Sequence, residues 1–441
     1  MIDINQLKNN EQFRARLLER APDLDVTKVL ELDDNLRKER QKNENLRSER
    51  NVGTAKIAEL MKTDKIRASK LVLDMKVVGA KIELGDRKIA KLENQIFDML
   101  AKFPNVPSSG VVMGYKEANK VVGSFGKKPE FTFKPKDHVE LCTSLGLIDY
   151  ERGTRMSGSG HWVYIGSGAM LEWALLNYFV DFHTKNGYKF VMPPHLLNYE
   201  SGYAAGQFPR FMDDVFFVQR GQGTKFDPKA AKFLAPTSET ALINMHRGET
   251  IPGDQMPIKY FGYSPCYRGE PGGYGASERG TIRGHQFNKV EMFIFCNPDE
   301  STMFFDELVK NAEELISGLG LHFNTVALAA GDMSAAMSKT CDTEVWIPSL
   351  GYKEVSSISN AICYQARRAN VRTKIAQHEC SDGVCRKVVK TDYAHTLNAS
   401  GLATSRLIPA IVEQFQNEDG SVDIPPVLHK YMHGITKLTP Q

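Results

Sequence analysis

Hydrophobic residues in the N-terminal part of the chain follow a helical spacing. Between Thr27 and Phe103 they recur at intervals of three and four within a highly charged stretch that contains no proline. Apolar residues at this spacing lie along one face of a helix. The apolar seam is sparse before Thr63 and richer after it, so the pattern predicts two long helices that turn between Thr63 and Ala68 and pair antiparallel.

The remaining sequence has a different pattern, in which polar and apolar residues alternate in short runs. The runs come as hairpins with helical segments between them, which favours an antiparallel sheet flanked by helices over a parallel one. The predicted fold class is therefore α+β. We expect three parts: an antiparallel two-helix arm in residues 1–103 with a coiled coil in about 27–103, a proline- and glycine-rich linker in residues 104–135, and a sheet domain in residues 136–441.

One predicted hairpin carries many of the polar and aromatic side chains. It runs from Tyr267 to Phe295 and consists of a strand, a polar loop and a returning strand. Side chains two residues apart share a face of a strand, so Arg268 and Glu270 lie together. The returning strand has a polar face with Arg283, His285, Phe287, Lys289 and Glu291, and an apolar face with Ile282, Val290 and Met292.

The side chains of this hairpin suit a nucleotide. Arginine offers a planar fork of donors to phosphate or carboxylate, and an aromatic ring beside it can stack on a base. The loop contains Gly272, Gly273, Gly275 and Gly280, which allow a close approach to a ligand. The sequence has no GxxxxGK[ST] loop, so we expect a triphosphate that lies across a sheet. A surface hairpin with scattered charges is the alternative interpretation.

The sequence around Arg268 resembles motif 2 of the class II aminoacyl-tRNA synthetases. An aromatic residue, an arginine, a small residue and a glutamate precede the glycine-rich loop, and IRGHQFNKVE follows it. The HQFNKVE form is similar to the seryl-tRNA synthetase branch, and the arm, the linker and the later motifs resemble that family in the same order. The resemblance implies a class II catalytic domain in residues 136–441 and a serine–tRNA ligase. Its substrates would be L-serine, ATP with Mg²⁺, and tRNA(Ser), with tRNA(Sec) as a second candidate.

The resemblance also assigns roles to individual residues. Arg268 would hold the α-phosphate and the serine carboxylate, and Arg406 the γ-phosphate. Catalytic roles fall on Arg268, Arg406 and Glu291. ATP-binding roles fall on Arg268, Gly269, Glu270, Arg283, Phe287, Glu354, Val355, Ser356, Ser357 and Arg406. Serine-binding roles fall on Thr237, Ser238, Glu239, Arg268, Glu291, Asn398 and Ser400.

Four residues depart from the pattern of the family. Ser238 stands in TSE where the family has TAE, Cys363 stands where it usually has aspartate, and Ala399 stands where TLNGSGLA has glycine. Alone, TSE is typical of a helix cap. We expect a small-residue turn at Ala399–Gly401 that opens a helix. Pro409 would lie inside that helix, where an interior proline costs on the order of 3 kcal/mol unless the helix bends.

The arm has an excess of positive charge although the whole chain is nearly neutral. Lysines and arginines outnumber acids by about eight between residues 37 and 91, whereas the net charge of the chain is +3. Such an arm would lie along an RNA backbone, or its charges would only keep a coiled coil soluble. The resemblance implies the first interpretation, with tRNA contacts from Arg37, Arg40, Arg47, Arg50 and Lys76.

Other features concern location, assembly and metal binding. The chain has 7 cysteines without the spacing of a disulfide scaffold and no run of eighteen apolar residues, so we expect a cytoplasmic protein without a membrane span. The segment Met170–Lys185 resembles motif 1, which implies a homodimer through this region. His378, Cys380 and Cys385 make a weak zinc signal, so we expect no protein-bound metal and a hairpin that turns at residues 381–383.

Two other functions stay open from the sequence. One is a related acyl-adenylate ligase that loads a carrier protein or serves a biosynthetic pathway, although such an enzyme needs no basic arm. The other is a non-catalytic RNA-binding regulator. The presence of Arg268, Glu291 and Arg406 argues against the regulator.

Overall fold

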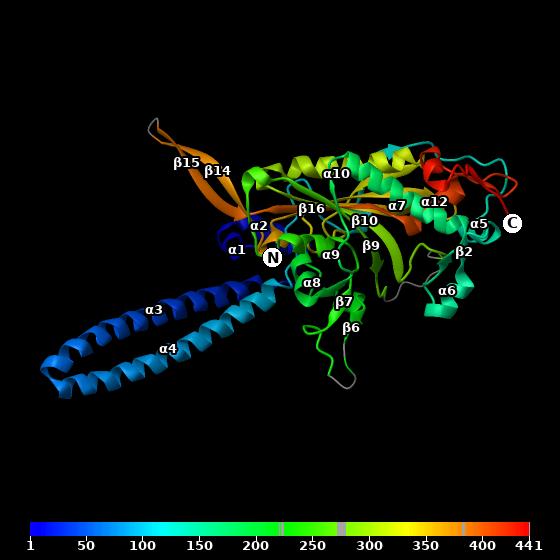
Figure 1. The fold of residues 1–441 in the computed structure, drawn as a ribbon. Helices are drawn as coiled ribbons and strands as arrows, with labels where there is room; N and C mark the ends of the chain where they lie inside the picture. The colour runs from blue at the N-terminus through cyan, green and yellow to red at the C-terminus, as the bar shows by residue number, and fades with distance from the viewer. Residues whose placement is uncertain (220, 222–224, 271–278, 382–383, 441) are drawn as a thin grey trace. The chain divides into compact units, whose positions relative to one another are not determined.

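The computed structural model describes residues 1–219, 221, 225–270, 279–381 and 384–440, and between residues 377 and 387 it describes the backbone only. Within these ranges the chain forms two units. One unit comprises residues 2–103, and the other comprises residues 104–441 together with Met1. Figure 1 shows the first unit in shades of blue and the second from cyan to red.

The N-terminal unit is an antiparallel pair of long helices preceded by two short ones. The long helices lie side by side, as Figure 1 shows, and Asp64 connects them. The Asp64 side chain accepts hydrogen bonds from the N–H groups of Ile66 and Arg67, which caps the second long helix. The predicted coiled coil and its turn are confirmed. The helices are α1 (Ile4–Asn9), α2 (Glu11–Arg20), α3 (Val26–Thr63) and α4 (Lys65–Leu100).

The two long helices approach closely where Asn43 of α3 faces Gly85 of α4. Asn43 is buried, and its Nδ2 donates to Oδ1 of Asp86 at 2.6 Å. A Cβ atom on Gly85 would lie 2.6 Å from Oδ1 of Asn43, so no side chain fits between the helices at this point. A polar side chain within an apolar seam fixes the register of a helix pair. Asn43 therefore helps to determine which residues of α3 and α4 face each other.

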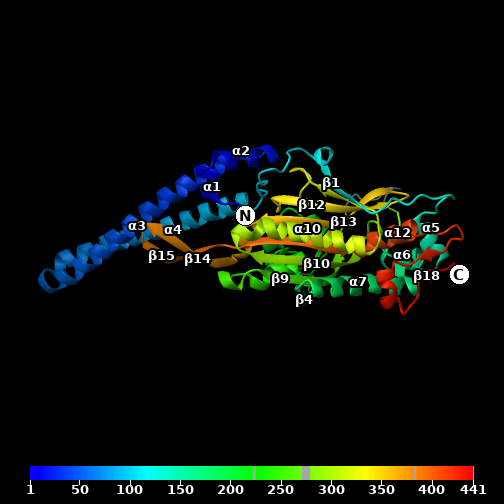
Figure 2. The ribbon, with the colours of Figure 1, turned by 90° about the horizontal axis from the view of Figure 1, so that it is seen from above.

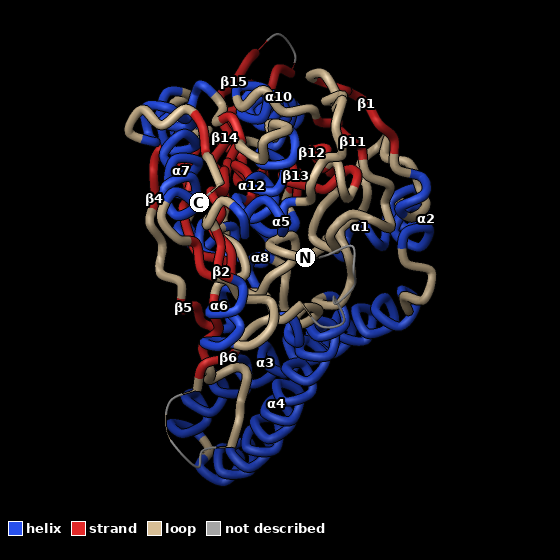
Figure 3. Tube along the Cα trace, turned by 90° about the vertical axis from the view of Figure 1, so that its right-hand side faces the viewer, coloured by secondary structure: helices blue, strands red, loops and turns tan. Residues whose placement is uncertain are grey.

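The second unit is built on an 8-stranded sheet. Neighbouring strands in it are antiparallel, except for the parallel edge pair β4 and β9. Figure 2 shows its strands side by side from above, and Figure 3 shows them in red. The predicted mostly antiparallel sheet is confirmed. Its spatial order is β1 (Lys120–Phe125), β11 (Phe323–Ala327), β12 (Lys339–Ile347), β13 (Gly351–Ile362), β16 (His395–Ala403), β10 (Gln286–Cys296), β9 (Ile258–Tyr267) and β4 (Lys189–Val191).

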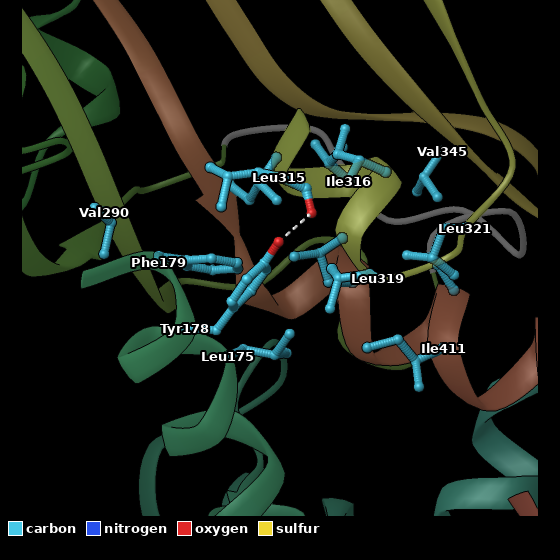
Figure 4. Packing of buried hydrophobic residues seen from close by; sticks show 14 of the residues in the cluster. Leu175, Tyr178, Phe179, Val290, Leu315, Ile316, Leu319, Leu321, Val345 and Ile411 are labelled. Carbon is cyan, nitrogen blue, oxygen red and sulfur yellow. Dashed lines mark hydrogen bonds between the residues drawn. The ribbon is translucent and has the colours of Figure 1, made fainter. Parts of the chain in front are cut away.

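Helices cover both faces of this sheet. The largest hydrophobic cluster joins one face to α7 (Ser167–Lys185), α10 (Ser301–Gly318) and α12 (Thr404–Gln414). Within it the hydroxyl of Tyr178 donates to the carbonyl of Leu315 at 3.2 Å, as Figure 4 shows. Phe293 and Phe295 pack on the opposite face, among residues of three short helices. These are α8 (Tyr199–Ala205), α9 (Glu239–Leu242) and α11 (Tyr364–Ala369), and the remaining helices are α5 (His138–Ser144) and α6 (Tyr150–Ser157).

Strand β10 presents different side chains to the two faces. Val290, Met292 and Ile294 have no exposed surface and belong to the cluster with α7, α10 and α12. Lys289 and Glu291 alternate with them, so their side chains point to the opposite face. The predicted alternation is confirmed for this part of the hairpin.

Residues 104–135 pack onto the sheet unit. They contain β1, which pairs with β11 from Lys120 to Phe125. The buried Asn105 donates from Nδ2 to the carbonyls of Ala336 and Ala361, both at 2.9 Å. Proline and glycine content led us to expect a linker, but strand pairing and these buried hydrogen bonds attach the segment to the second unit.

The predicted turn at Ala399–Gly401 was wrong. These residues lie inside β16, and α12 begins after the strand has ended. Ala399 pairs with Met292 of β10 on one side and with Ile358 of β13 on the other. Pairing along both edges satisfies the backbone of this segment, so the sheet overrides the local preference of small residues for a turn.

The interior proline of α12 is present as predicted. Pro409 has no N–H group to bond the carbonyl four residues earlier, which belongs to Ser405. The hydroxyl of Thr281 donates to that carbonyl at 2.6 Å. The acceptor that the proline leaves free is therefore satisfied from outside the helix, which avoids the penalty of about 1–3 kcal/mol for an unpaired buried group.

Smaller sheets surround the main one. Strands β14 and β15 pair antiparallel up to Ser381 and Val384, which confirms the hairpin predicted there. The side chains of His378, Cys380 and Cys385 lie outside the described residues. The small sheets combine β2 (Ile148–Asp149) with β3 (Val163–Tyr164); β5 (Leu196–Asn198) with β7 (Lys232–Leu234) and β6 (Phe217–Val218); β8 (Thr250–Pro252) with β14 (Arg372–Ser381) and β15 (Val384–Tyr393); and β17 (Val422–Asp423) with β18 (Lys437–Leu438).

Two glycines of α4 test the close approach of the arm helices. Gly79→Ala should stabilise the arm by about 0.5–1 kcal/mol, because alanine suits a helix interior better and nothing lies within 4 Å of its Cβ atom. Gly85→Ala should instead destabilise the arm by about 1–3 kcal/mol, because it displaces Asn43. Unfolding of the full chain followed by circular dichroism measures both. Equal effects of the two substitutions would contradict the proposed close contact.

Candidate active site

A cavity of about 420 Å³ opens on the sheet face to which Lys289 and Glu291 of β10 point, opposite α7 and α10. A smaller hollow adjoins it, and the two form one continuous site. The larger part is walled by the start of α9, by β10 and by β16, and the smaller part by β10, β13 and the first turn of α12. Residues that line both parts are Arg268, Glu270, Arg283, Lys289, Glu354 and Ser400.

Most of the residues predicted to bind ATP and serine meet at this site. They come from segments far apart in the sequence, because neighbouring strands of the sheet are not consecutive along the chain. The larger cavity is lined by Thr237, Glu239, Arg268, Glu270, Arg283, Glu291, Glu354, Ser357, Asn398 and Ser400. The smaller hollow adds Phe287, Val355 and Arg406.

A buried ion pair lies at the centre of the site. Nζ of Lys289 is 2.5 Å from Oε2 of Glu291, and the two residues are 6% and 1% exposed. Ser400 and Asn398 of β16 both donate to the Glu291 carboxylate, at 3.3 and 3.0 Å. A buried charge needs such partners, because removing it from water is costly. The alternation of β10 placed Lys289 on this face, but no role was predicted for it.

Glu239 supplies a second carboxylate at the same end of the cavity. Its Oε1 accepts a hydrogen bond from Nε2 of Gln365 at 2.6 Å. Burial, reinforced by the negative charge of Glu291, raises the pKa of Glu239 to about 7. Gln365 was not predicted, because a glutamine in a helical segment gives no signal that distinguishes it from an ordinary core residue.

The guanidinium and aromatic groups of the hairpin lie as the alternation predicted, with one exception. The guanidinium carbon of Arg268 is 5.2 Å from the ring centre of Phe287. Nε of Arg283 is 2.6 Å from Oε2 of Glu270, whose backbone has a φ of 43°. His285 precedes β10 and does not line the site; its Nδ1 lies 3.0 Å from the carbonyl oxygen of Arg268. Residues 271–278, with three of the four loop glycines, lie outside the described residues.

Arg406 is held at the smaller end of the site by backbone and side-chain oxygens. Its Nη1 donates to the carbonyl of Glu354 at 2.6 Å, and its Nε donates to the carbonyl of Ile282 at 3.3 Å. The carboxylate of Glu354 is 3.6 Å away. Ser357 hydrogen-bonds Asp342 on the neighbouring strand, where burial and then the charge of Glu354 raise the pKa of Asp342 well above its usual range.

Ser238 does not line the cavity, in contrast to its predicted serine-binding role. It is fully buried, and its hydroxyl lies 2.7 Å from the hydroxyl of Ser264 on β9. The residues on either side of it, Thr237 and Glu239, do face the cavity. The additional hydroxyl is therefore paired within the protein.

Two predicted ATP ligands also lie away from the cavity. Ser356 is fully buried, and its hydroxyl donates to the carbonyl of Ser400 at 2.5 Å, which joins β13 to β16. The N–H of Gly269 donates to the carbonyl of Asp214 at 2.7 Å. Sequence spacing could not separate these residues from their neighbours, because the partners that turn them away are distant in the sequence.

The other departures leave the lining of the cavity unchanged. Cys363 precedes α11, and its sulfur accepts a hydrogen bond from Nε of Arg367 at 3.4 Å. Ala399 is fully buried in the core. No role was predicted for several lining residues, because they come from loops and from strand positions without a recognisable motif. These are Gln207, Phe211, Asp214, Val215, Pro236, Ser334, Met337 and Ser359.

In the arm, three of the five residues predicted to contact tRNA form ion pairs. Arg37 pairs with Asp33 at 2.8 Å, Arg40 with Glu93 at 2.6 Å and Arg47 with Asp86 at 2.8 Å. The three arginine side chains are 53%, 58% and 55% exposed. Glu93 and Asp86 are exposed as well, whereas Asp33 is buried. Pairs that are exposed on both sides contribute only about 0–1 kcal/mol, so those of Arg40 and Arg47 can be exchanged for other anions. Arg50 and Lys76 are also exposed.

Metal-ligating side chains are sparse in the described ranges. No three histidine, cysteine, aspartate or glutamate residues there are placed to hold a metal ion together. Glu354 and Ser357 still offer carboxylate and hydroxyl oxygens next to each other at the cavity, the kind of ligand that Mg²⁺ takes when phosphates supply the rest. None of the described helices is both long enough and apolar enough to cross a membrane.

Comparison with known proteins identifies a matching family for each of the two units. Residues 224–415 match the tRNA synthetase class II core domain (G, H, P, S and T), and residues 1–107 match the seryl-tRNA synthetase N-terminal domain. Serine–tRNA ligase 2 of Clostridium acetobutylicum is 47% identical over 434 residues, 98% of this chain and 99% of the relative. Serine–tRNA ligase of Geobacter sulfurreducens is 38% identical over 442 residues, 99% of this chain and 100% of the relative. The crystal structure of seryl-tRNA synthetase from Pyrococcus horikoshii complexed with ATP has a TM-score of 0.89 and 30% identity, with 100% of each chain covered.

The antiparallel sheet and the arginines that converge on its open face are those of a class II aminoacyl-tRNA synthetase. The helical arm and the full-length similarity then specify the branch. The chain belongs to the seryl-tRNA synthetase family. The predicted enzyme class, an aminoacyl-tRNA ligase specific for serine, is confirmed by these relatives, which do not support the carrier-loading or regulatory alternatives.

The buried hydroxyl pair can be tested with a double-mutant cycle. Ser238→Ala should lower the free energy of unfolding by about 1–2 kcal/mol, because the Ser264 hydroxyl loses its partner. Ser264→Ala should have a similar effect, and the double variant should lose less than the sum. Denaturant unfolding measures the four proteins. Additive losses would show that the two hydroxyls do not interact.

Proposed function

We propose that this site activates L-serine with ATP and transfers the seryl group to the 3′ end of tRNA(Ser), with tRNA(Sec) as a second candidate acceptor. One observation carries the proposal: the residues expected for ATP and those expected for serine line adjoining parts of one site, with Arg268 lining both. In the first step the serine carboxylate attacks the α-phosphorus of ATP and pyrophosphate leaves. In the second, a hydroxyl of the terminal adenosine attacks the carbonyl carbon and AMP leaves.

Neither step needs a nucleophile from the protein, so position and charge supply most of the acceleration. Arg268 neutralises the α-phosphate and the serine carboxylate, and Arg406 binds the γ-phosphate. Phe287 stacks on the adenine ring while Glu270 accepts a hydrogen bond at its edge. Glu354 and Ser357 would hold Mg²⁺ through their oxygens when it is bound with ATP, and the ion would supply positive charge to the phosphates.

The carboxylates of the larger cavity suit the rest of the serine molecule. Glu239 accepts hydrogen bonds from the ammonium group, with Thr237 beside it. Glu291 and Ser400 bond the substrate hydroxyl, and Asn398 holds Glu291 in place. A buried site that bonds a hydroxyl rejects alanine strongly, because its polar groups would be left unpaired, whereas threonine is excluded only by size.

The arm is proposed to bind tRNA through its phosphates. Arg40 and Arg47 exchange their exposed carboxylate partners for phosphate oxygens, and Arg37, Arg50 and Lys76 add further contacts. Each phosphate contact releases condensed counterions, so binding through the arm weakens as salt increases.

The assembly is proposed to be a cytoplasmic homodimer. Large apolar side chains are exposed on α7, on β4 and directly after β4, with Trp173 at 57%, Phe190 at 41% and Met192 at 73% exposure. A second copy of the chain would cover such a surface. The described cysteines Cys142, Cys266, Cys296, Cys341 and Cys363 are free thiols, which suits a reducing compartment.

Removal of Arg268 tests the centre of the site. Arg268→Ala should reduce serine-dependent ATP–pyrophosphate exchange by on the order of 10³-fold, because the charge that develops at the α-phosphate loses its counter-charge. Arg155→Ala is the matched control, since Arg155 of α6 is exposed and pairs with Glu151 in its own helix. Comparable exchange by the two variants would refute the assignment of Arg268.

The raised pKa of Glu239 predicts that kcat/KM for serine depends on pH. Because this pKa is raised to about 7, the carboxyl group becomes neutral as the pH falls below 7 and no longer attracts the serine ammonium group. At saturating ATP, kcat/KM for serine should therefore fall by up to about tenfold per pH unit below 7. Glu239→Gln should be much less active and should lose most of this dependence. An equally steep profile in that variant would assign the titration to another group.

The overall proposal is tested by exchange with each standard amino acid, followed by charging of total tRNA. Exchange with serine and transfer to tRNA with a long variable arm are the expected results. Exchange without transfer would contradict the proposed acceptor. A folded protein without exchange would contradict the proposed activation step.

A further inference from the structure

Glu172 is a buried carboxylate behind the site that the proposed chemistry does not use. It lies on α7, on the sheet face opposite the cavity, and is only 3% exposed. Its Oε1 accepts two hydrogen bonds, from Nδ2 of Asn288 at 2.8 Å and from the hydroxyl of Thr404 at 2.5 Å. Within the described part of the chain, its Oε2 has no hydrogen-bond partner. A single oxygen therefore joins helix α7 to strand β10 and to the first residue of α12.

The bond to Asn288 fixes the part of β10 that borders the site. Asn288 lies between Phe287 and Lys289, whose side chains point into the cavity while that of Asn288 points to the other face. The other end of its amide is also held, because Oδ1 accepts a hydrogen bond from the hydroxyl of Tyr263 at 3.1 Å. With both ends of the side chain bonded, the strand cannot shift at Phe287 without breaking one of these contacts.

The bond to Thr404 fixes the start of α12. Thr404 is fully buried, and its hydroxyl lies 3.1 Å from the carbonyl of Asn288 as well. Arg406 lies two residues further along the same helix and reaches the smaller end of the cavity. The orientation of the first helical turn therefore determines where the Arg406 guanidinium lies.

Burying a carboxylate costs free energy, which argues against a role for Glu172 in packing alone. Burial raises the pKa of Glu172 to about 7, which shows that the surroundings disfavour its charge although two donors face it. Glu413 provides a comparison: it is also a buried carboxylate and lies on α12 itself, but it bonds His138 and Ser349, far along the helix from Arg406. The two carboxylates are similarly buried, and only Glu172 bonds residues that adjoin the cavity.

We propose that Glu172 is a positioning residue that, through Asn288 and Thr404, holds Phe287 and Arg406 in place for ATP. It touches no substrate. The inference rests on the proposed function, because it takes the smaller end of the site to be the ATP site. It adds that the helix expected at the dimer interface is bonded directly to both segments that contact the nucleotide.

The test is a comparison of kinetic constants and ATP affinity for three variants at the junction. In Glu172→Ala, KM for ATP in serine-dependent exchange should rise at least about tenfold, and kcat/KM for ATP should fall by on the order of 10²-fold, because small displacements of positioning groups have effects of this size. KM for serine should change less than about twofold. Glu172→Gln keeps an acceptor oxygen for both donors and should restore most of the ATP affinity. Thr404→Val keeps the shape of the side chain, removes one donor and should weaken ATP binding less than Glu172→Ala.

Glu413→Ala is the matched control, and it should lower thermal stability without changing KM for ATP. Calorimetric titration with ATP alone accompanies the kinetics, so that affinity is known without catalysis. Unchanged ATP affinity in Glu172→Ala and Thr404→Val, or an equal loss in Glu413→Ala, would overturn the inference while leaving the proposed function intact. If Glu172→Ala does not fold, the ATP affinity of Thr404→Val alone tests the inference. A wild-type protein that binds no ATP would overturn both the proposed function and this inference.

Discussion

The alternation of side chains along β10 is the constraint on which the catalytic unit depends. One face of this strand, with Val290, Met292 and Ile294, belongs to the core, and the other carries Lys289 and Glu291 into the site. A slip of one residue would exchange the two sets and bury the charges among apolar side chains. β9 and β16 pair with the strand on both edges and fix its register. The core and the site are thus specified together.

The buried carboxylates Glu291 and Glu239 of the site have partners before a substrate arrives. Glu291 is held by Lys289 and by two donors of β16, and Glu239 is held by Gln365. Glu291 lies close enough to Glu239 for its charge to raise the pKa of Glu239, in addition to the effect of burial. An ammonium group at Glu239, as proposed for serine, would relieve this repulsion. Such preorganisation leaves little rearrangement for the moment of reaction.

Much of the fold and most of the site could be predicted from the sequence, because helix spacing, strand alternation and motif order are local signals. The errors came from contacts between distant segments. Ser238 and Ser356 face hydroxyl and carbonyl partners on other strands, and Ala399 is held in a strand by neighbours on both sides. Gln365 acquires its role only because α11 packs beside Glu239. No spacing rule contains such information.

The bond between Thr281 and the carbonyl that Pro409 leaves free has a consequence for how the family can vary. In a chain without this proline, the helix would satisfy the Ser405 carbonyl itself, and the Thr281 hydroxyl would no longer be needed for it. In a chain with the proline but without this hydroxyl, the Ser405 carbonyl would lack a hydrogen-bond donor. The two positions, more than a hundred residues apart, therefore form a pair whose members are expected to be inherited and replaced together.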